Sequence, residues 1–439
     1  PDLPANTWCT SVYPSRFQKG PAYATFDGHR NDDITSYIYR TTDFGNTWNS
    51  LATEHIKAYC HKILEDLVNP DLLFLGTEFG LYVSVDGGES WAQFKNQLPN
   101  VSVMDMVIHP REHDLVMGTH GRGVYIIDDI SPLRQLTPEV LDSEFVFLQQ
   151  RDPVPMVVSG PSWPNFDDDF TASNPISSIP VTFYMKKRHL IGKMTMEIFD
   201  TEGRLLTEIP LVTRKGINQV YWTPVQKPPR NPVSEAIPFQ MQIAMMGGGM
   251  TYPEGDYRVK VTRKDEVFET MVTVHNNPDL PYTEDDRELK RKYLKIGFDL
   301  MEDLAYADRL ITDVQKGLKT MESLTGISAS TRKKADELEE CLKDVRNRMM
   351  VTEYGDLRGD SRLREDVGFL YGTIAFYGGR PTRVQMDRMA LLELRVSAMV
   401  EEVDELLKLY LDKINKGINK AGGEAIAVTT REAFDAESR

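Results

Sequence analysis

The first part of the chain, up to about residue 130, consists of short apolar runs separated by polar turn-forming residues. Each run is rich in β-branched or aromatic side chains and ends near Gly, Pro or Asp, which is the pattern of short β-strands. The runs recur as a unit of strands that closes on a characteristic turn. The pattern therefore predicts an antiparallel β structure built from a repeated unit.

One octamer marks the repeat. Residues 41–48 and 84–91 both read [ST]-x-D-x-G-x-[ST]-W, and Asp43 and Asp86 lie 43 positions apart. A period in the forties is typical of one four-stranded propeller blade. The octamer predicts a tight turn in which Asp accepts backbone hydrogen bonds, Gly adopts a positive φ and Trp is buried between sheets. The residues expected to have this structural role are Asp43, Gly45, Trp48, Asp86, Gly88 and Trp91.

A third copy of the repeat lacks the octamer. Residues 69–84 align with residues 109–126, but residues 127–133 (IDDISPL) replace the turn. We therefore expect residues 1–141 to form the last three blades of a propeller. A closed propeller needs at least four blades, and three alone would leave sheet faces and edges uncovered. The remaining blades are expected to belong to an N-terminal portion of the protein that is absent from this chain. The chain begins at Pro1 as if cut from something longer, and the N-terminal portion can stay bound to it as a separate polypeptide.

After the repeat, two further patterns follow. Residues 142–178 are rich in Pro and Gly and are predicted to be a linker. Residues 179–278 return to period-two alternation with closely spaced turns, which favours an immunoglobulin-like β-sandwich. The overall fold class is then mainly β followed by α, with a partial propeller, a sandwich and a helical C-terminal region.

From Tyr282 onward the apolar residues recur at helical spacing. Thr283 is placed to cap the first helix, and Thr382 with Gln385 forms a capping box for the last. Four amphipathic helices with short connections predict an antiparallel bundle over residues 279–422. Residues 423–439 are polar and are expected to be a loose tail. Because no Glu-x-x-His pair occurs in the helices, a di-metal site inside the bundle is not expected. No cofactor and no other metal site is predicted.

Composition and charge narrow the classes of partner. The net charge of −15 argues against nucleic acid and against an anionic membrane as partners. No apolar run approaches the length of a membrane span. Cys9, Cys60 and Cys341 show no metal-ligand spacing. A disulfide between Cys9 and Cys60 is conceivable, and two separately buried thiols are the alternative.

Candidate functional residues gather at one predicted rim. In a blade, the loops between the second and third strands lie opposite the octamers, so these loops should meet at one face. Grouped carboxylates, His and Arg supply acid, base and anion-binding groups, although such loop charges are often only solvated or lock neighbouring blades. The rim residues are His29, Arg30, Asp32, Asp33, Glu78, Phe79, His120 and Arg122.

A reaction at this rim would rest on its carboxylates. Glycoside hydrolysis requires two carboxyl groups about 5–10 Å apart, and Asp32 or Asp33 with Glu78 is the pair that the sequence offers. A sialidase-like site would need an arginine cluster, for which Arg30 and Arg122 are available. The sequence has no phosphate-binding glycine loop, no Gly-x-Ser-x-Gly and no His-Glu-x-x-His.

The octamer resembles the Asp-box, or BNR repeat, of sialidases, sortilin-type receptors and xyloglucanase-like propellers. Residues 25–30 (TFDGHR), 75–84 (LGTEFGLYVS) and 118–133 (GTHGRGVYIIDDISPL) resemble a bacterial family of envelope or secreted proteins labelled glycosyl hydrolase BNR-repeat or sortilin-like. The resemblance implies an exported protein that is extracellular, periplasmic or at the cell surface. The Asp-box is a folding motif, so the resemblance implies a fold more than a reaction.

Two hypotheses about function follow. In the first, a non-catalytic binding or scaffold protein holds a protein, peptide or glycan on the propeller rim. In the second, a glycoside hydrolase uses the rim carboxylates Asp32, Asp33 and Glu78 as acid and base.

Overall fold

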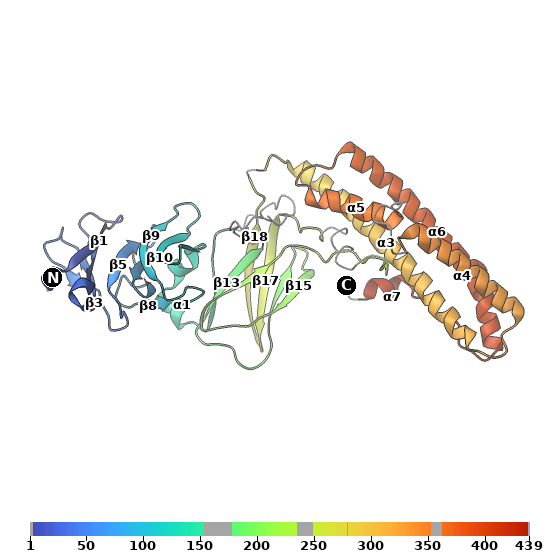
Figure 1. Cartoon of the computed structure of the whole chain (residues 1–439), viewed down its shortest axis with the longest axis horizontal. Coiled ribbons are helices and arrows are strands. Elements are labelled where there is room, and N and C mark those ends of the chain that lie inside the picture. The colour runs from blue at the N-terminus through green and yellow to red at the C-terminus, as the bar shows by residue number, and fades with distance from the viewer. Residues whose placement is uncertain (1–2, 153–177, 235–248, 279, 353–361, 438–439) are drawn as a thin grey trace. The chain divides into compact units, whose positions relative to one another are not determined.

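A computed structural model describes residues 3–152, 178–234, 249–278, 280–352 and 362–437 (Figure 1). The chain is mainly β-sheet with a C-terminal helical region. It divides into two compact units. The β unit comprises Pro1–Pro153, Ile179–Trp222 and Gly255–His275, and the helical unit comprises Val154–Ser178, Thr223–Glu254 and Asn276–Arg439.

The repeats form three antiparallel sheets in which neighbouring strands are consecutive in sequence. The first sheet contains β1 (Trp8–Pro14), β2 (Ala22–Gly28), β3 (Asp33–Thr41) and β4 (Asn49–Ser50). The second contains β5 (Cys60–Glu65), β6 (Leu73–Thr77), β7 (Gly80–Ser84) and β8 (Ala92–Phe94). The third contains β9 (Ser102–Ile108), β10 (Leu115–His120) and β11 (Val124–Ile127). Such meanders are the unit of a propeller, but the described sheets do not close into a ring.

The second sheet packs between the other two, and Figure 1 shows β1, β5 and β9 in neighbouring groups of strands. Because successive strand residues point to opposite faces, Ile63 faces the first sheet and Leu64 faces the third. Buried carboxylates connect the sheets as well. Glu65 accepts a hydrogen bond from the Tyr23 hydroxyl of the first sheet, and Asp66 accepts hydrogen bonds from Nε and Nη2 of Arg134 at 2.8 and 2.9 Å.

The rest of the β unit is a pair of antiparallel sheets. One contains β12 (Phe145–Leu148), β13 (Ile179–Met185) and β16 (Gly216–Trp222), and the other contains β15 (Leu205–Pro210), β14 (Met194–Phe199), β17 (Gly255–Arg263) and β18 (Glu266–Val274). Aromatic rings join the two sheets, because Phe145 stacks on both Phe183 and Phe268. The immunoglobulin-like topology stays a prediction.

The predicted linker contains a strand. Within residues 142–178, Phe145–Leu148 forms β12 and pairs with β13. This apolar run supplies one more strand for the paired sheets. The Pro- and Gly-rich average composition of residues 142–178 predicted a linker because it does not reflect these four residues. Residues 153–177, with most of the predicted linker, lie outside the described residues.

The helical unit contains four long or medium helices and one short one in its described residues. They are α3 (Glu284–Glu322), α4 (Ala329–Met349), α5 (Leu363–Phe376), α6 (Arg383–Lys420) and α7 (Arg431–Ala436). Capping boxes begin α3 at Thr283 and α6 at Thr382, so local sequence fixes both starting points. The buried leucines and valines of α3, α4, α5 and α6 form one core. None of the described helices is long and apolar enough to span a bilayer.

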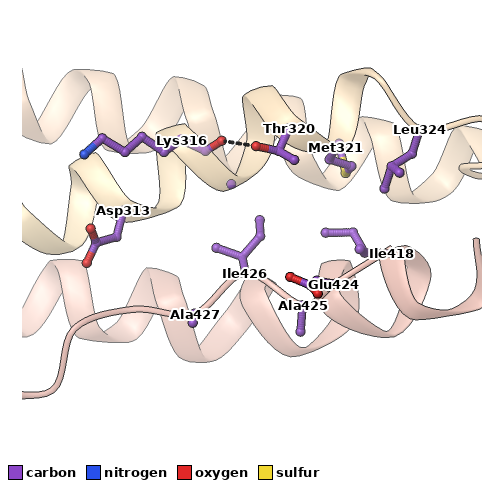
Figure 2. Close-up of a pocket in the computed structure, with 11 residues that line it drawn as sticks. Asp313, Lys316, Thr320, Met321, Leu324, Ile418, Glu424, Ala425, Ile426 and Ala427 are labelled. Carbon is purple, nitrogen blue, oxygen red and sulfur yellow. Dashed lines mark hydrogen bonds between the residues drawn. The ribbon is translucent and has the colours of Figure 1, made fainter. Parts of the chain in front are cut away.

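The expectation of a loose polar tail over residues 423–439 is wrong for its described part, residues 423–437. Ile426 is buried in the helical core, and the buried Phe434 ring lies 5.3 Å from the ring of Tyr306 in α3. Figure 2 shows Ile426 pointing toward α3 beside a hollow lined by Lys316, Thr320 and Met321. Thr429 donates two hydrogen bonds to Asp313, at 3.0 Å from its backbone nitrogen and 2.6 Å from its hydroxyl. A few apolar residues at the right positions outweigh a polar average composition.

The three cysteines are free thiols. Cys9 is exposed and Cys60 is buried in the core between the first and second sheets. Burial raises the pKa of the Cys60 thiol to about 12, so this group remains protonated at neutral pH. The expectation of two separate thiols is correct, but the expectation that both are buried is wrong for Cys9, which lies exposed in β1.

Candidate functional site

The first strand of each propeller-like sheet carries a β-bulge near its start. The pairing skips Thr10 in β1, His61 in β5 and Met104 in β9. A bulge leaves one residue unpaired and redirects its side chain. The repeat therefore places a different side chain at an equivalent, redirected position in each sheet, at the end where the candidate rim was predicted.

His61 is the bulge residue with the most contacts to neighbouring elements. Its imidazole is buried, and its Nε2 lies 3.1 Å from Oε2 of Glu78 and 3.1 Å from Oγ of Ser102. Glu78 belongs to the β6–β7 turn, and Ser102 begins β9 in the third sheet. The imidazole thus joins the second sheet to the third.

The contacts continue into the first sheet. Tyr59 stacks on His29 with ring centroids 4.7 Å apart, and its ring meets His61 edge-on at 5.4 Å. Nδ1 of His29 lies 2.6 Å from Oδ2 of Asp27. We call this set of residues from all three repeats and the connection before β5 the rim network: Asp27, His29, Tyr59, His61, Glu78 and Ser102.

The network does not have the geometry of a hydrolytic triad. In a triad, the histidine uses one ring nitrogen for the serine and the other for the carboxylate. Here Glu78 and Ser102 both contact Nε2 of His61. The arrangement orients side chains and buries polar atoms rather than activating the Ser102 hydroxyl.

Electrostatics keep Glu78 ionised. Burial raises its pKa, but hydrogen bonds from His61, Ser102 and Tyr59 together outweigh burial and lower the pKa below its usual value. For Tyr59, burial and the Glu78 charge raise the phenol pKa. At neutral pH the site therefore holds a carboxylate facing a neutral phenol.

The predicted catalytic carboxylates Asp32 and Asp33 make contacts of their own and, in the described part of the chain, do not join Glu78. Asp33 accepts a hydrogen bond from the Tyr37 hydroxyl at 2.7 Å and from the Thr35 amide at 3.0 Å. Hydrogen bonds from Thr35 and Tyr37 lower the Asp33 pKa. Asp32 is exposed, with a positive φ of 60° at the end of the short His29–Asn31 helix. Among the described contacts, none joins Asp32 or Asp33 to Glu78.

The predicted binding residues divide into two groups. His29 belongs to the rim network, and Arg30 beside it lies over the Trp8 ring at 5.6 Å. Phe79 is 51% exposed next to Glu78, and its carbonyl accepts a hydrogen bond from Gln93. His120 and Arg122 are exposed around the β10–β11 turn. The structure thus brings His29 into one network with Glu78 and leaves aromatic surface beside it.

The octamer turns share one hydrogen-bond pattern. Oδ1 of Asp43 accepts from the Thr41 hydroxyl at 2.9 Å and from the Thr47 amide at 2.8 Å, and Asp86 repeats this pattern with its own neighbours. Gly45 and Gly88 have φ values of 87° and 96°. These carboxylates are occupied within their own turns.

The two octamer tryptophans differ in burial. The expectation that both are buried between sheets is correct for Trp91, whose Nε1 donates to the Leu51 carbonyl of the preceding repeat at 3.0 Å. It is wrong for Trp48, which is half-buried and donates to Gly45 within its own turn. The reason is that no sheet precedes the first one in the described residues.

Sequence reasoning missed Tyr59, His61 and Ser102. These residues lie in or beside β5 and β9, which the pattern marks as core strands. The available signal was Cys60-His61-Lys62, where a polar pair interrupts an apolar strand. Its meaning depends on a bulge that is visible only in the strand pairing.

The described residues contain no group of three or more His, Cys, Asp or Glu side chains able to hold a metal ion.

Comparisons with known proteins assign no family. No family model matches the chain, and no curated protein matches it. Among solved structures, the chain is similar to YCF48 bound to D1 peptide, with 16% identity, a TM-score of 0.22 and coverage of 28% of this chain and 36% of that one. It is also similar to the GH74 enzyme of Niastella koreensis, with 14% identity, a TM-score of 0.25 and coverage of 60% and 38%.

A third similarity is to the GH74 xyloglucanase of Xanthomonas campestris, with 11% identity, a TM-score of 0.22 and coverage of 65% and 47%. The chain thus spans less than half the length of each of these three proteins. Similarity at this level transfers neither a reaction nor a ligand to the chain.

Proposed function

We propose that the three propeller-like sheets are a section of an Asp-box propeller of the sortilin-like type, which binds a protein, peptide or glycan at its rim without catalysis. The observation that carries the proposal is the rim network with the exposed side chains beside it. His29 offers an exposed ring face held by Tyr59 and Asp27, and Phe79 offers an exposed aromatic edge. Rigid aromatic groups beside fixed carboxylates suit recognition of sugar rings and of peptide side chains.

The hydrolase alternative receives less support. A glycosidase acid must remain protonated near neutral pH, which requires a raised pKa. Hydrogen bonds lower the pKa of Asp33, and in Glu78 they outweigh the effect of burial, so both carboxyl groups are ionised. The lowered pKa values of Asp33 and Glu78 favour binding over acid catalysis. Export to an extracellular, periplasmic or cell-surface location is part of the proposal and rests on the motif resemblance.

Panels of immobilised glycans and peptides, probed with the purified chain, test the proposal. His29→Ala and Phe79→Ser should each weaken binding to a positive probe by about tenfold or more, as expected for loss of an aromatic contact. Phe44→Ser is the matched control, because Phe44 is also an exposed phenylalanine but lies in the first octamer turn. If Phe44→Ser weakens binding as much as Phe79→Ser, the rim is not the binding site.

The same samples test catalysis. Polysaccharides of the panel are incubated with the chain and with Glu78→Gln and Asp33→Asn variants. If the unaltered chain hydrolyses a polysaccharide and both variants have lost this activity, the hydrolase hypothesis would replace the binding proposal.

We also propose that further sheets of the same repeat cover the open face of the third sheet, as partner blades from an N-terminal portion of the protein. The second sheet packs against the third with four apolar side chains, Leu64, Phe74, Leu81 and Val83. The strand pairings place four apolar residues at the equivalent positions of the third sheet, Val107, Val116, Val124 and Ile126.

The exposure of the third sheet supports this proposal. Val107, Val124 and Ile126 are 59, 65 and 56% exposed, whereas their counterparts in the second sheet are buried. A sheet face that repeats the packing residues of an internal interface fits another sheet of the same kind. Hydroxyl-radical footprinting should find these residues protected in protein isolated from its natural source and modified in the isolated chain. Equal modification in both samples would contradict the proposal.

A further inference from the structure

Three connections of the sandwich meet at one end. Strand pairings place Met185 opposite Gly216, Met194 opposite Arg263 and Thr195 opposite Pro210. The connections 186–193, 211–215 and 264–265 therefore leave the sheets at the same edge. A hydrogen bond of 3.3 Å from the His189 amide to the Thr213 hydroxyl joins the first two connections. We call residues 186–193, 211–215 and 263–266 the basic end.

The basic end exposes large aliphatic side chains. Leu190 and Ile191 are 76 and 77% exposed, and Val212 on the neighbouring connection is 87% exposed. Single exposed apolar residues are ordinary, but these three lie at the tips of connections joined by a hydrogen bond. Their aliphatic surface is available to an apolar partner.

The same connections carry many cations. Some are paired with carboxylates, as Lys186 is with Asp142 at 2.6 Å, Lys193 with Glu208 at 2.9 Å and Arg263 with Glu266 at 2.7 Å. Others have no carboxylate within ion-pair distance among the described residues. These are Arg188, Arg214, Lys215 and Lys264.

The cluster differs from the chain as a whole, which carries a net charge of −15. The negative net charge repels an anionic surface mainly at long range. At physiological salt, charges more than about 8–10 Å away are screened, so a local cluster governs what the basic end attracts. The cluster also contains Asp265 and Glu266, and nearby Asp142, Glu144 and Glu208 reduce its charge without cancelling it.

We propose that the basic end binds an anionic lipid surface. Leu190, Ile191 and Val212 enter the boundary between headgroups and acyl chains, while the unpaired cations lie against the lipid phosphates. This combination suits a bilayer better than an acidic protein, because the aliphatic tips project from separate connections rather than line a groove. The proposal is independent of ligand binding at the propeller rim.

Sedimentation of the full chain with vesicles tests the proposal. Vesicles of equal parts phosphatidylcholine and phosphatidylglycerol should bind the chain at about 0.1 M salt, and binding should fall steeply at 1 M salt. The variant Arg188→Glu/Lys215→Glu/Lys264→Glu should bind at least roughly a hundredfold more weakly, at about fivefold for each cation lost, because each glutamate also adds a negative charge. Leu190→Ser/Ile191→Ser should bind at least about tenfold more weakly, because the serines have little apolar surface to bury.

Matched controls separate a specific surface from general charge. Arg332→Glu/Lys333→Glu/Lys343→Glu changes charge equally on exposed positions of α4, and Leu205→Ser removes an exposed leucine at the other end of β15. Both controls should bind like the unaltered chain. Equal loss in the controls, unchanged binding by the basic-end variants, or no binding to anionic vesicles would overturn the proposal. So would binding to an acidic polypeptide, such as polyglutamate, without binding to vesicles. Thermal denaturation confirms that each variant is folded.

Discussion

At the scale of single residues, buried polar side chains determine how the propeller-like sheets meet. His61 contacts both Glu78 and Ser102, Glu65 accepts a hydrogen bond from the Tyr23 hydroxyl, and Asp66 forms an ion pair with Arg134. Each contact crosses between repeats or stabilises a connection between them. Hydrogen bonds to ionised groups contribute more than neutral ones, and an unpaired buried partner is costly. These residues therefore specify the packing of neighbouring sheets as well as stabilising it.

Glu78→Gln should lower the free energy of unfolding of the β unit at pH 7 by about 1 kcal/mol, because it weakens charged hydrogen bonds. The folded-state pKa of Glu78 lies below its usual value, so this stabilisation is present above the unfolded pKa and is lost as pH falls through the folded pKa. The difference from the unaltered chain should therefore shrink at acid pH. Urea unfolding across the pH range measures it, with exposed Glu54→Gln as the control. A difference that stays constant with pH would contradict this prediction.

The two octamer tryptophans provide a second comparison. Trp91→Phe should cost about 1 to 2 kcal/mol, because it removes a buried hydrogen bond between repeats and part of a packed ring. Trp48→Phe should cost less than about 0.5 kcal/mol, since its indole is half-buried and bonds within its own turn. Urea denaturation of both variants measures the costs. Equal losses would show that the contact between repeats is not what distinguishes them.

At the scale of elements, one glycine allows the C-terminal segment to pack on α3. A Cβ at Gly317 would approach Cγ1 and Cγ2 of Ile426 to 2.6 Å, closer than real side chains come. Asn415 holds the same residue from α6, accepting from the Ile426 amide and donating to its carbonyl. Glycine in a helix interior costs about 1 kcal/mol relative to alanine, so its presence here reflects the close contact.

Gly317→Ala should therefore displace the segment around Ile426 even though alanine favours the helix. The expected result is faster removal of the C-terminal residues in limited proteolysis and a lower melting temperature. In Gly317→Ala/Ile426→Ala the two 2.6 Å contacts are removed and only the 3.0 Å contact with the Cβ of residue 426 remains, so adding Gly317→Ala to an Ile426→Ala background should cost much less than in the unaltered chain. A cost that is the same in both backgrounds would show that the two residues are not coupled.

At the scale of the whole molecule, the chain contains two compact units with separate cores. The β unit holds four of the five tryptophans, Trp8, Trp48, Trp91 and Trp222, whereas the long helices belong to the helical unit. The fifth, Trp163, lies outside the described residues, so its replacement by Phe keeps the fluorescence signal to the β unit. Tryptophan fluorescence and helical circular dichroism therefore report mainly on different units.

The two signals should give transitions that do not coincide in urea. Leu304→Ala, in the helical core, should shift the circular dichroism transition by an amount corresponding to about 2–5 kcal/mol and leave the fluorescence transition in place. Phe74→Ala, in the core of the second and third sheets, should do the reverse. If both variants shift both transitions equally, the units unfold as one.

The sequence predicted much of the fold because those parts depend on local interactions. Period-two and period-3.6 patterns placed strands and helices, and the side chains of Thr283 and Thr382 marked helix starts. The rim was harder to predict. Sequence placed His29 and Glu78 on it, but missed His61, because a bulge changes the direction of one side chain without altering the apolar pattern.

By itself, the sequence determined the repeat, the octamer turns and the change from strands to helices, since each depends on residues close together in the chain. Tertiary structure decided which carboxylates have partners, which tryptophan is buried and whether the last residues pack. It also decided that distant connections form the basic end of the sandwich. These features depend on contacts between residues far apart in sequence, which local patterns do not encode.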